Sequence, residues 1–206
     1  MTRTLLACGM VAGPLFVIAF LVAGALRADY SPLRHPVSSL AIGDAGWTQA
    51  ANFLVTGLLV LAFAVGLRRS GSGRWLPVLV GLVGIGLLGA GLFTCDPING
   101  YPPGTPLAPV PTVRGTLHRA FSALVFLGLP IAALVAARGE HRRGFARYGL
   151  VSAVAFLALF VLAALGFAQQ PVLLPVGGLL QRLCLVVGLA WLTVLAVDRA
   201  RGAPTG

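Results

Sequence analysis

The chain has 206 residues, of which 58% are hydrophobic and only 10% are charged. A water-soluble domain carries about 25% charged residues, and one of this length cannot bury so much apolar surface. The composition therefore excludes a soluble globular protein and predicts an integral membrane protein. The formal net charge of +10 comes entirely from Arg, without Lys. These arginines lie mostly between apolar runs, so membrane topology explains them better than nucleic-acid binding, which we do not expect.

Six apolar runs are long enough to cross a bilayer, which takes about 20 residues in a helix. They predict helices at about 4–26, 48–67, 75–95, 115–137, 148–168 and 176–198. Continuous runs of this length favour helices over the shorter, alternating strands of a barrel. The first run is too long for the apolar core of a signal peptide, so we expect it to remain as a helix. The prediction is an all-α bundle of six transmembrane helices, forming a single membrane domain over residues 1–206.

The placement of arginines predicts the orientation of the chain. A cytoplasmic N-terminus puts most of them on the cytoplasmic side, as the positive-inside rule requires: Arg3, Arg68, Arg69, Arg74, Arg138, Arg142, Arg143, Arg147, Arg199 and Arg201. Both termini are therefore expected in the cytoplasm. The use of Arg in place of Lys, with abundant Ala and Gly, indicates a GC-rich, bacterial source. The predicted location is the inner (plasma) membrane, with several passes.

Two long loops, at 27–47 and 96–114, then lie on the outer side. The first contains the polar stretch YSPLRHPVSSLAIGDAGW at residues 30–47. We expect a short helix from about Pro36 to Ile42, capped by Ser38 or Ser39, to fold as a lid over the mouth of the bundle. The second loop is rich in Pro and Gly, and at this length it is either functional or disordered.

Polar side chains gather near the predicted outer ends of the helices. Each needs a reason, because polar groups are costly inside a bilayer. Asn52 shares one face of its helix with two other polar residues, and His118 shares a face with Ser122, whereas Arg119 points elsewhere. Gln181 and Arg182 lie inside the outer end of the sixth run.

Acidic partners are scarce. Of the five acids, Glu140 and Asp198 fall on the inner side, and Asp96 is the outer acid nearest to the membrane. Because Asp96 and Arg182 have the same predicted depth, we expect them to form an ion pair with His118 nearby. On the inner side, His141 among its arginine neighbours is expected to be solvated.

These residues allow several kinds of chemistry. A hydrolytic triad would use Ser39 or Ser38 as nucleophile, His118 or His35 as base, and Asp96 or Asp44 as orienting acid, but no GxSxG motif accompanies them. His35, His118 and Asp96 lack the spacing of a zinc site, and only one His lies on a predicted span. We therefore predict neither metal nor cofactor.

A ligand site is the further alternative. The fork-shaped guanidinium groups of Arg34, Arg114, Arg119 and Arg182 suit an anionic lipid headgroup, although interfacial anchoring explains Arg114 better. Gln181 and Asn52 are neighbouring polar candidates. Among the cysteines, Cys8 and Cys184 lie inside apolar runs. The sequence does not decide whether Cys95 and Cys184 form a disulfide.

Several short segments, taken in order, resemble a bacterial six-helix membrane family catalogued as domain of unknown function 998. They are YSPLRHPVSSL, a Gly before Trp47 followed by ANFLVTGLL, then FTCDP, GTLHRAFS and QRLCLVVGLAW. The resemblance covers nearly the whole chain and implies a six-helix bundle in a bacterial inner membrane, without an established activity. That family commonly has Glu before the arginine of its sixth helix, where this chain has Gln181, so the resemblance gives no support for an acid at that position.

Three functions remain open at this point. The first is binding or processing of a lipid or another amphiphile at the outer leaflet, and the second is a non-enzymatic accessory or assembly role in which the polar residues are structural. A small transporter is disfavoured, since the sequence shows neither an inverted repeat nor a midplane charge. Convergence of His118, Asp96, Arg182 and the first outer loop on one cavity would favour the first function. Whether the protein is an enzyme, and its oligomeric state, are left open.

Overall fold

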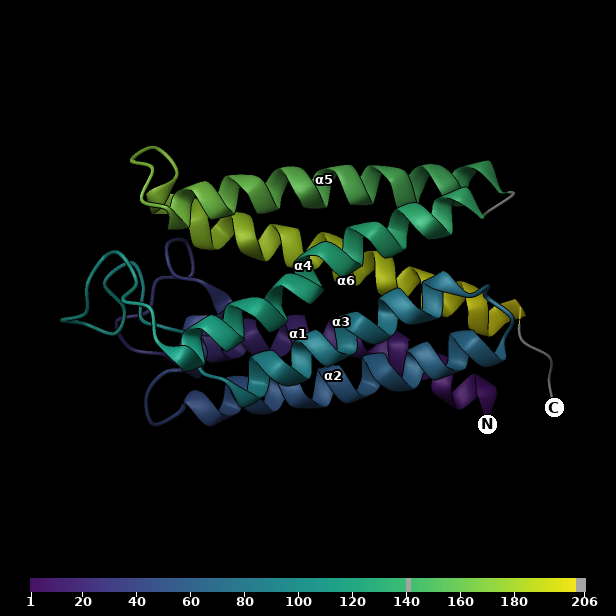
Figure 1. Ribbon diagram of the computed structural model, residues 1–206, viewed down its shortest axis with the longest axis horizontal. Helices are drawn as coiled ribbons and strands as arrows, with labels where there is room; N and C mark the ends of the chain where they lie inside the picture. The colour runs from purple at the N-terminus through teal and green to yellow at the C-terminus, as the bar shows by residue number, and fades with distance from the viewer. Residues whose placement is uncertain (140–141, 203–206) are drawn as a thin grey trace.

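A computed structural model describes residues 1–139 and 142–202 (Figure 1). Within these residues the elements are α1 (Thr2–Leu26), η1 (Val37–Ala41), α2 (Gly46–Arg69), α3 (Trp75–Leu92), α4 (Val113–Arg138), α5 (Arg143–Phe167), η2 (Leu174–Val176) and α6 (Gly177–Gly202). The described residues contain six helices that are long and apolar enough to cross a membrane, and no strand. The prediction of an all-α, six-helix bundle is confirmed.

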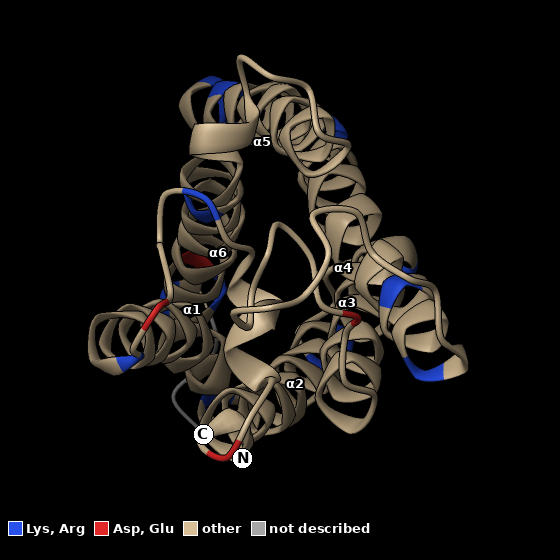
Figure 2. Ribbon diagram, turned by 90° about the vertical axis from the view of Figure 1, so that its left-hand side faces the viewer, with Lys and Arg blue, Asp and Glu red and all other residues tan. Residues whose placement is uncertain are grey.

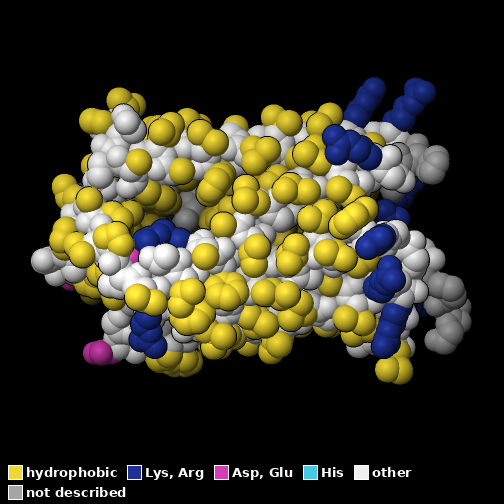
Figure 3. All heavy atoms as spheres, in the orientation of Figure 1, with side chains coloured by type: hydrophobic (Ala, Val, Ile, Leu, Met, Phe, Trp, Pro, Cys, Tyr) yellow, Lys and Arg dark blue, Asp and Glu magenta, His cyan; other side chains and the backbone are white. Residues whose placement is uncertain are grey.

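The two ends of the bundle differ. The start of α1 and the end of α6 lie at one end, here called the terminal end, and the connections 27–45, 93–112 and 168–176 lie at the other, the loop end (Figure 1). Apolar side chains cover the surface between them, and Arg side chains gather at the terminal end (Figure 3). The cytoplasmic placement of the termini remains a prediction. Glu140 and His141, expected in a cytoplasmic loop, lie outside the described residues.

The helices form a ring in chain order, which α1 closes by packing against α6 (Figure 2). The close approach of α2 and α3 depends on glycine. A Cβ built on Gly57 would lie 3.0 Å from the carbonyl oxygen of Gly84, and one on Gly84 would lie 3.0 Å from that of Gly57. Small residues allow this contact between helix backbones in lipid. Gly57 and Gly84 therefore serve the packing of α2 against α3.

The expected short helix in the first loop is present as η1, but its capping differs from the prediction. Neither Ser38 nor Ser39 caps it. Instead, the backbone N–H of Val37 donates to Oε1 of Gln181 on α6 over 2.8 Å. At the other end, Arg27 donates to the carbonyls of Ile42 and Leu40 over 2.7 and 3.0 Å. The lid is therefore held at both ends by side chains from α6 and the end of α1.

Arg182 anchors the chain segment that precedes η1. Only 6% of Arg182 is exposed. Its Nη1 donates to the carbonyls of Pro32, His35 and Gly178 over 2.6, 2.9 and 2.9 Å, and its Nη2 donates to the Tyr30 hydroxyl. The predicted Asp96–Arg182 ion pair is wrong: Arg182 is satisfied by backbone carbonyls and a phenol, and Asp96 has another partner, described below.

Asn99 connects the lid segment to the connections 93–112 and 168–176. This residue is 1% exposed. Its Nδ2 donates to the carbonyl of Arg34 over 3.1 Å, and its Oδ1 accepts from Nε2 of Gln169 over 2.7 Å. The Pro- and Gly-rich second loop is thus packed against the first loop and tied to the third.

We predict that Arg182→Gln destabilises the protein strongly. The glutamine cannot reach the same set of acceptors, and buried carbonyls that lose their donors are costly. The free energy of unfolding should fall by about 3 kcal/mol, the scale for removing one partner from a buried charged network. Thermal and denaturant unfolding in detergent would measure the loss. The control is Arg114→Gln, which removes an exposed arginine from the same end; equal unfolding of the two variants would contradict the prediction.

Candidate functional site

A cavity of about 370 Å³ lies near the loop end of the bundle, within the range of about 300–1,000 Å³ typical of small-molecule sites. Each of the six helices contributes to its apolar wall: Phe16, Phe53, Leu87, Phe126, Phe160 and Leu185. Such a wall can hold an apolar chain.

The loop end of the cavity is polar. The lid contributes residues 36–38 to this end. The second loop contributes Cys95, Asp96 and two apolar residues, Ile98 and Pro109. The polar side chains that line the cavity, besides those of Cys95 and Asp96, are Ser38, His118, Arg119, Ser122 and Gln181. The first loop, His118 and Asp96 therefore converge on one cavity, but Arg182, the fourth member of the expected set, does not line it.

The cavity opens sideways between α4 and α5. These helices lie close together at the terminal end and separate toward the loop end (Figure 1), and the same face is hollowed there in Figure 3. Ala123 on α4 and Ala164 on α5 line the cavity and are also exposed. Pro130 lies inside α4, where its ring and missing N–H favour a bend. In a membrane this opening faces the acyl chains.

An ion pair lies at the polar end of the cavity. The Asp96 carboxylate accepts from Arg119 Nη1 over 2.8 Å and from the hydroxyl and backbone N–H of Thr112 over 2.6 and 3.2 Å. The Asp96 side chain is 3% exposed and that of Arg119 is 49% exposed. Gly115 is required here, because a Cβ at this position would overlap the carboxylate. Arg119, predicted to point elsewhere, is the partner that Asp96 takes in place of Arg182.

His118 presents a hydrogen-bond acceptor to the cavity. Its Nδ1 lies 2.8 Å from the carbonyl oxygen of Phe93 and 3.1 Å from that of Ala90. Both neighbours can only accept, so we assign the proton to Nδ1, which leaves a lone pair on Nε2 in the neutral ring. Nε2 makes no hydrogen bond within the described part of the chain. Asp96 does not contact Nδ1, so the triad alternative that pairs His118 with Asp96 is not assembled.

Comparison with known families identifies the chain. Residues 10–198 match a family described as protein of unknown function (DUF998). The chain belongs to the DUF998 family. The matched region includes every residue that lines the cavity. No curated protein and no solved structure matches the sequence.

Several predicted site residues of this DUF998 protein lie away from the cavity. Ser39 is fully buried, and its hydroxyl has no partner among the described residues. The Asn52 amide donates to the Phe16 carbonyl over 3.2 Å and so links α2 to α1. Arg34 and Arg182 belong to the lid anchorage. None of these four residues lines the cavity.

His35 is also structural. Its ring clusters with those of Tyr30 and Tyr101, at centroid distances of 5.5 and 5.0 Å, and the two tyrosine rings lie 5.3 Å apart. Its Nδ1 accepts from the backbone N–H of Ser31 over 2.9 Å. Burial lowers the pKa of His35 from its ordinary value of 6.5, and the charges of Arg34 and Arg182 lower it further. A neutral His35 therefore holds the lid segment against the second loop.

Metal-ligand types do not cluster, and the thiols are unpaired. Among the described residues, no three His, Cys, Asp or Glu side chains come together. The three cysteines are free: Cys95 donates to the carbonyl of Ser38 over 3.2 Å, and Cys184 donates to that of Phe156 over 3.4 Å. The Cys95–Cys184 disulfide is therefore not formed. Burial raises the pKa of Cys95 to about 11, which keeps the thiol protonated as a donor.

Sequence reasoning missed the apolar half of the site. Phe126 and Phe160 stack with a centroid distance of 4.8 Å and line the cavity. In the sequence they cannot be told from lipid-facing aromatic residues. The sequence indicated only the polar part of the cavity, through His118 and Ser122, which are spaced four residues apart on one helix face.

We predict that acid destabilises the protein through His35. Because the folded state lowers the pKa of His35, the unfolded chain takes up this proton more readily. The stability from neutral His35 is therefore present above about pH 6.5 and is lost as the pH falls through 6.5 toward the folded pKa. Melting temperatures between pH 8 and pH 5 should fall less steeply for His35→Asn, which keeps an acceptor but does not titrate. Identical slopes for the variant and the parent would contradict this role.

Proposed function

We propose that this DUF998 protein binds an uncharged amphiphile that enters sideways from the outer leaflet. The observation that carries the proposal is the shape of the cavity, which has apolar walls, a polar loop end and an opening between α4 and α5. An acyl or isoprenoid chain matches the aromatic and aliphatic wall. The outer leaflet follows from the arginine bias, which favours a cytoplasmic terminal end.

The polar end favours a neutral headgroup. Asp96 cancels the charge of Arg119, so these two side chains add no net charge to the cavity. His118 offers an acceptor at Nε2, and Ser38 and Ser122 offer hydroxyl groups. A hydroxyl-bearing head, such as that of a monoacylglycerol or a long-chain alcohol, can donate to His118. An anionic phosphate would need an unpaired cation, and the one cation among the described residues that line this cavity, Arg119, is paired with Asp96.

The surroundings of His118 support binding over hydrolysis. A nucleophile–base pair of the serine-hydrolase type is oriented by an acid on the far nitrogen of the base. Here two backbone carbonyls occupy that nitrogen. They fix the ring, but they do not supply the negative charge that stabilises an imidazolium. The arrangement therefore suits a hydrogen-bond acceptor for a bound headgroup.

Photo-crosslinking tests the proposal. The full chain, reconstituted in phosphatidylcholine nanodiscs, is irradiated with a monoacylglycerol that carries a diazirine on its acyl chain. We expect labelled peptides from α4 and α5 within the cavity. Ala164→Trp should reduce labelling at least tenfold, because the indole fills the opening.

The matched control is Val154→Trp, which adds the same side chain to an exposed position of α5 outside the cavity. It should label like the parent chain. Replacing the probe by a phosphatidic acid analogue should weaken labelling. Equal labelling of the two tryptophan variants, or preference for the anionic probe, would overturn the proposal.

A further inference from the structure

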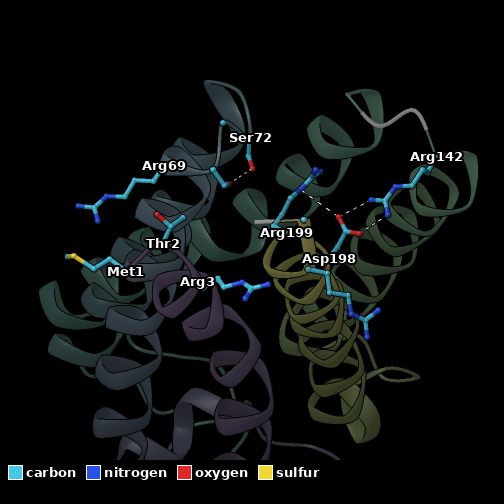
Figure 4. A pocket seen from close by; sticks show the side chains of 12 residues that line it. Met1, Thr2, Arg3, Arg69, Ser72, Arg142, Asp198 and Arg199 are labelled. Atoms are coloured by element: carbon cyan, nitrogen blue, oxygen red, sulfur yellow. Dashed lines mark hydrogen bonds and ion pairs between the residues drawn. The ribbon is translucent and has the colours of Figure 1, made fainter. Parts of the chain in front are cut away.

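A second hollow lies at the opposite end of the molecule. This recess, of about 890 Å³, lies at the terminal end and is formed by the start of α1, the turn after α2, the start of α5 and the end of α6 (Figure 4). It shares no lining residue with the amphiphile cavity.

The recess is strongly basic. Five arginines line it, of which four lie on α1, α2 and α6 and one directly precedes α5: Arg3, Arg69, Arg199, Arg201 and Arg142. Asp198 is the single acid among the described lining residues. Arg142 binds it through both guanidinium nitrogens, over 2.7 and 2.8 Å, and Arg199 Nε lies 3.8 Å away. The described lining thus holds five guanidinium groups and one carboxylate, an excess of positive charge.

Donors of a second kind accompany these charges. In Figure 4, Arg3 extends from α1 toward α6, and Arg199 extends past the end of α6 beside Asp198, whereas Arg69 points outward. Thr2, Ser70 and Ser72 line the same recess. The Ser70 hydroxyl donates to the Leu67 carbonyl over 3.0 Å and lies 3.0 Å from the Ser72 hydroxyl, whereas the Thr2 hydroxyl makes no hydrogen bond with a described residue. Arg3 and Arg201 are exposed and make no ion pair with any described residue. Guanidinium and hydroxyl donors around one open space are the groups that bind phosphate oxygens.

We propose that this recess binds a phosphate-bearing anion. Two sources share this chemistry: the headgroup of an anionic phospholipid in the adjoining leaflet, and a free phosphate compound. Basic pockets between transmembrane helices are suited to anionic headgroups. Arginines that serve topology alone need not converge on a shared space; Arg68, Arg74, Arg143 and Arg147 lie at the same end of the helices but outside the recess.

The test compares two variants with the same loss of charge. One is Arg3→Gln with Arg201→Gln in the recess; the other is Arg68→Gln with Arg74→Gln outside it. The full chain in a neutral detergent is mixed with equal amounts of phosphatidylglycerol and phosphatidylcholine and examined by native mass spectrometry. A second arm adds inorganic pyrophosphate and follows its binding by calorimetry. All of the proteins are first checked by gel filtration, and Arg3→Gln alone replaces the double variant if that variant does not fold.

We expect the parent chain to retain one of the anionic probes at least fivefold over the neutral lipid or over chloride. The recess variant should lose this preference at least fivefold, and the matched variant should keep it. Retention of phosphatidylglycerol alone identifies a lipid headgroup, and saturable pyrophosphate binding alone identifies a free phosphate compound. Equal losses in the two variants would mean attraction by surface charge in general and would overturn the proposal, as would binding of neither probe.

Discussion

A buried guanidinium without a carboxylate partner holds the loop end together. Arg182 would be costly to bury alone, but three carbonyl oxygens and the Tyr30 hydroxyl surround it, and the rings of Phe20 and Tyr30 lie 5.8 and 5.4 Å away. Apart from the Gly178 carbonyl, which lies on α6 itself, these acceptors belong to the segment just before η1. Arg182 therefore fixes where the lid begins, and the lid forms the roof of the cavity. An ammonium group at this position would lack the planar fork that reaches several acceptors at once.

The polar residues of the loop end form two groups, one that positions the loops and one that lines the cavity. One group, with Arg182, His35 and Asn99, bonds mainly to backbone groups and positions the loops. The other group, with His118 and the Asp96–Arg119 pair, lines the cavity and keeps some hydrogen-bonding capacity or exposure. The accessory-protein hypothesis describes the first group well. It leaves the apolar cavity and its sideways opening unexplained, and these features favour binding of an amphiphile.

The sequence predicts the helices, because they depend on the length and periodicity of apolar runs. It does not predict contacts between helices, because these depend on the position of each helix around the ring. Apolar runs identify the six helices, because each span must satisfy its own backbone in lipid. The third helix ends at Leu92 and not at 95, since Cys95 and Asp96 leave the helix to contact the lid and the start of α4. Depth alone cannot choose between Arg119 and Arg182 as the partner of Asp96. The choice follows from the packing of α3 beside α4, with α6 on the other side of the ring (Figure 2).

The Asn99–Gln169 hydrogen bond has a mechanical consequence. Gln169 follows α5 directly, and α5 forms one side of the sideways opening, whereas Asn99 also grips the lid segment through the Arg34 carbonyl. A molecule that displaces α5 outward on entry must therefore either move the lid segment together with the helix or break the Asn99–Gln169 hydrogen bond. The Asn99 side chain thus couples α5 to the lid segment. A change in the width of the opening between α4 and α5 is therefore coupled to a movement of the lid.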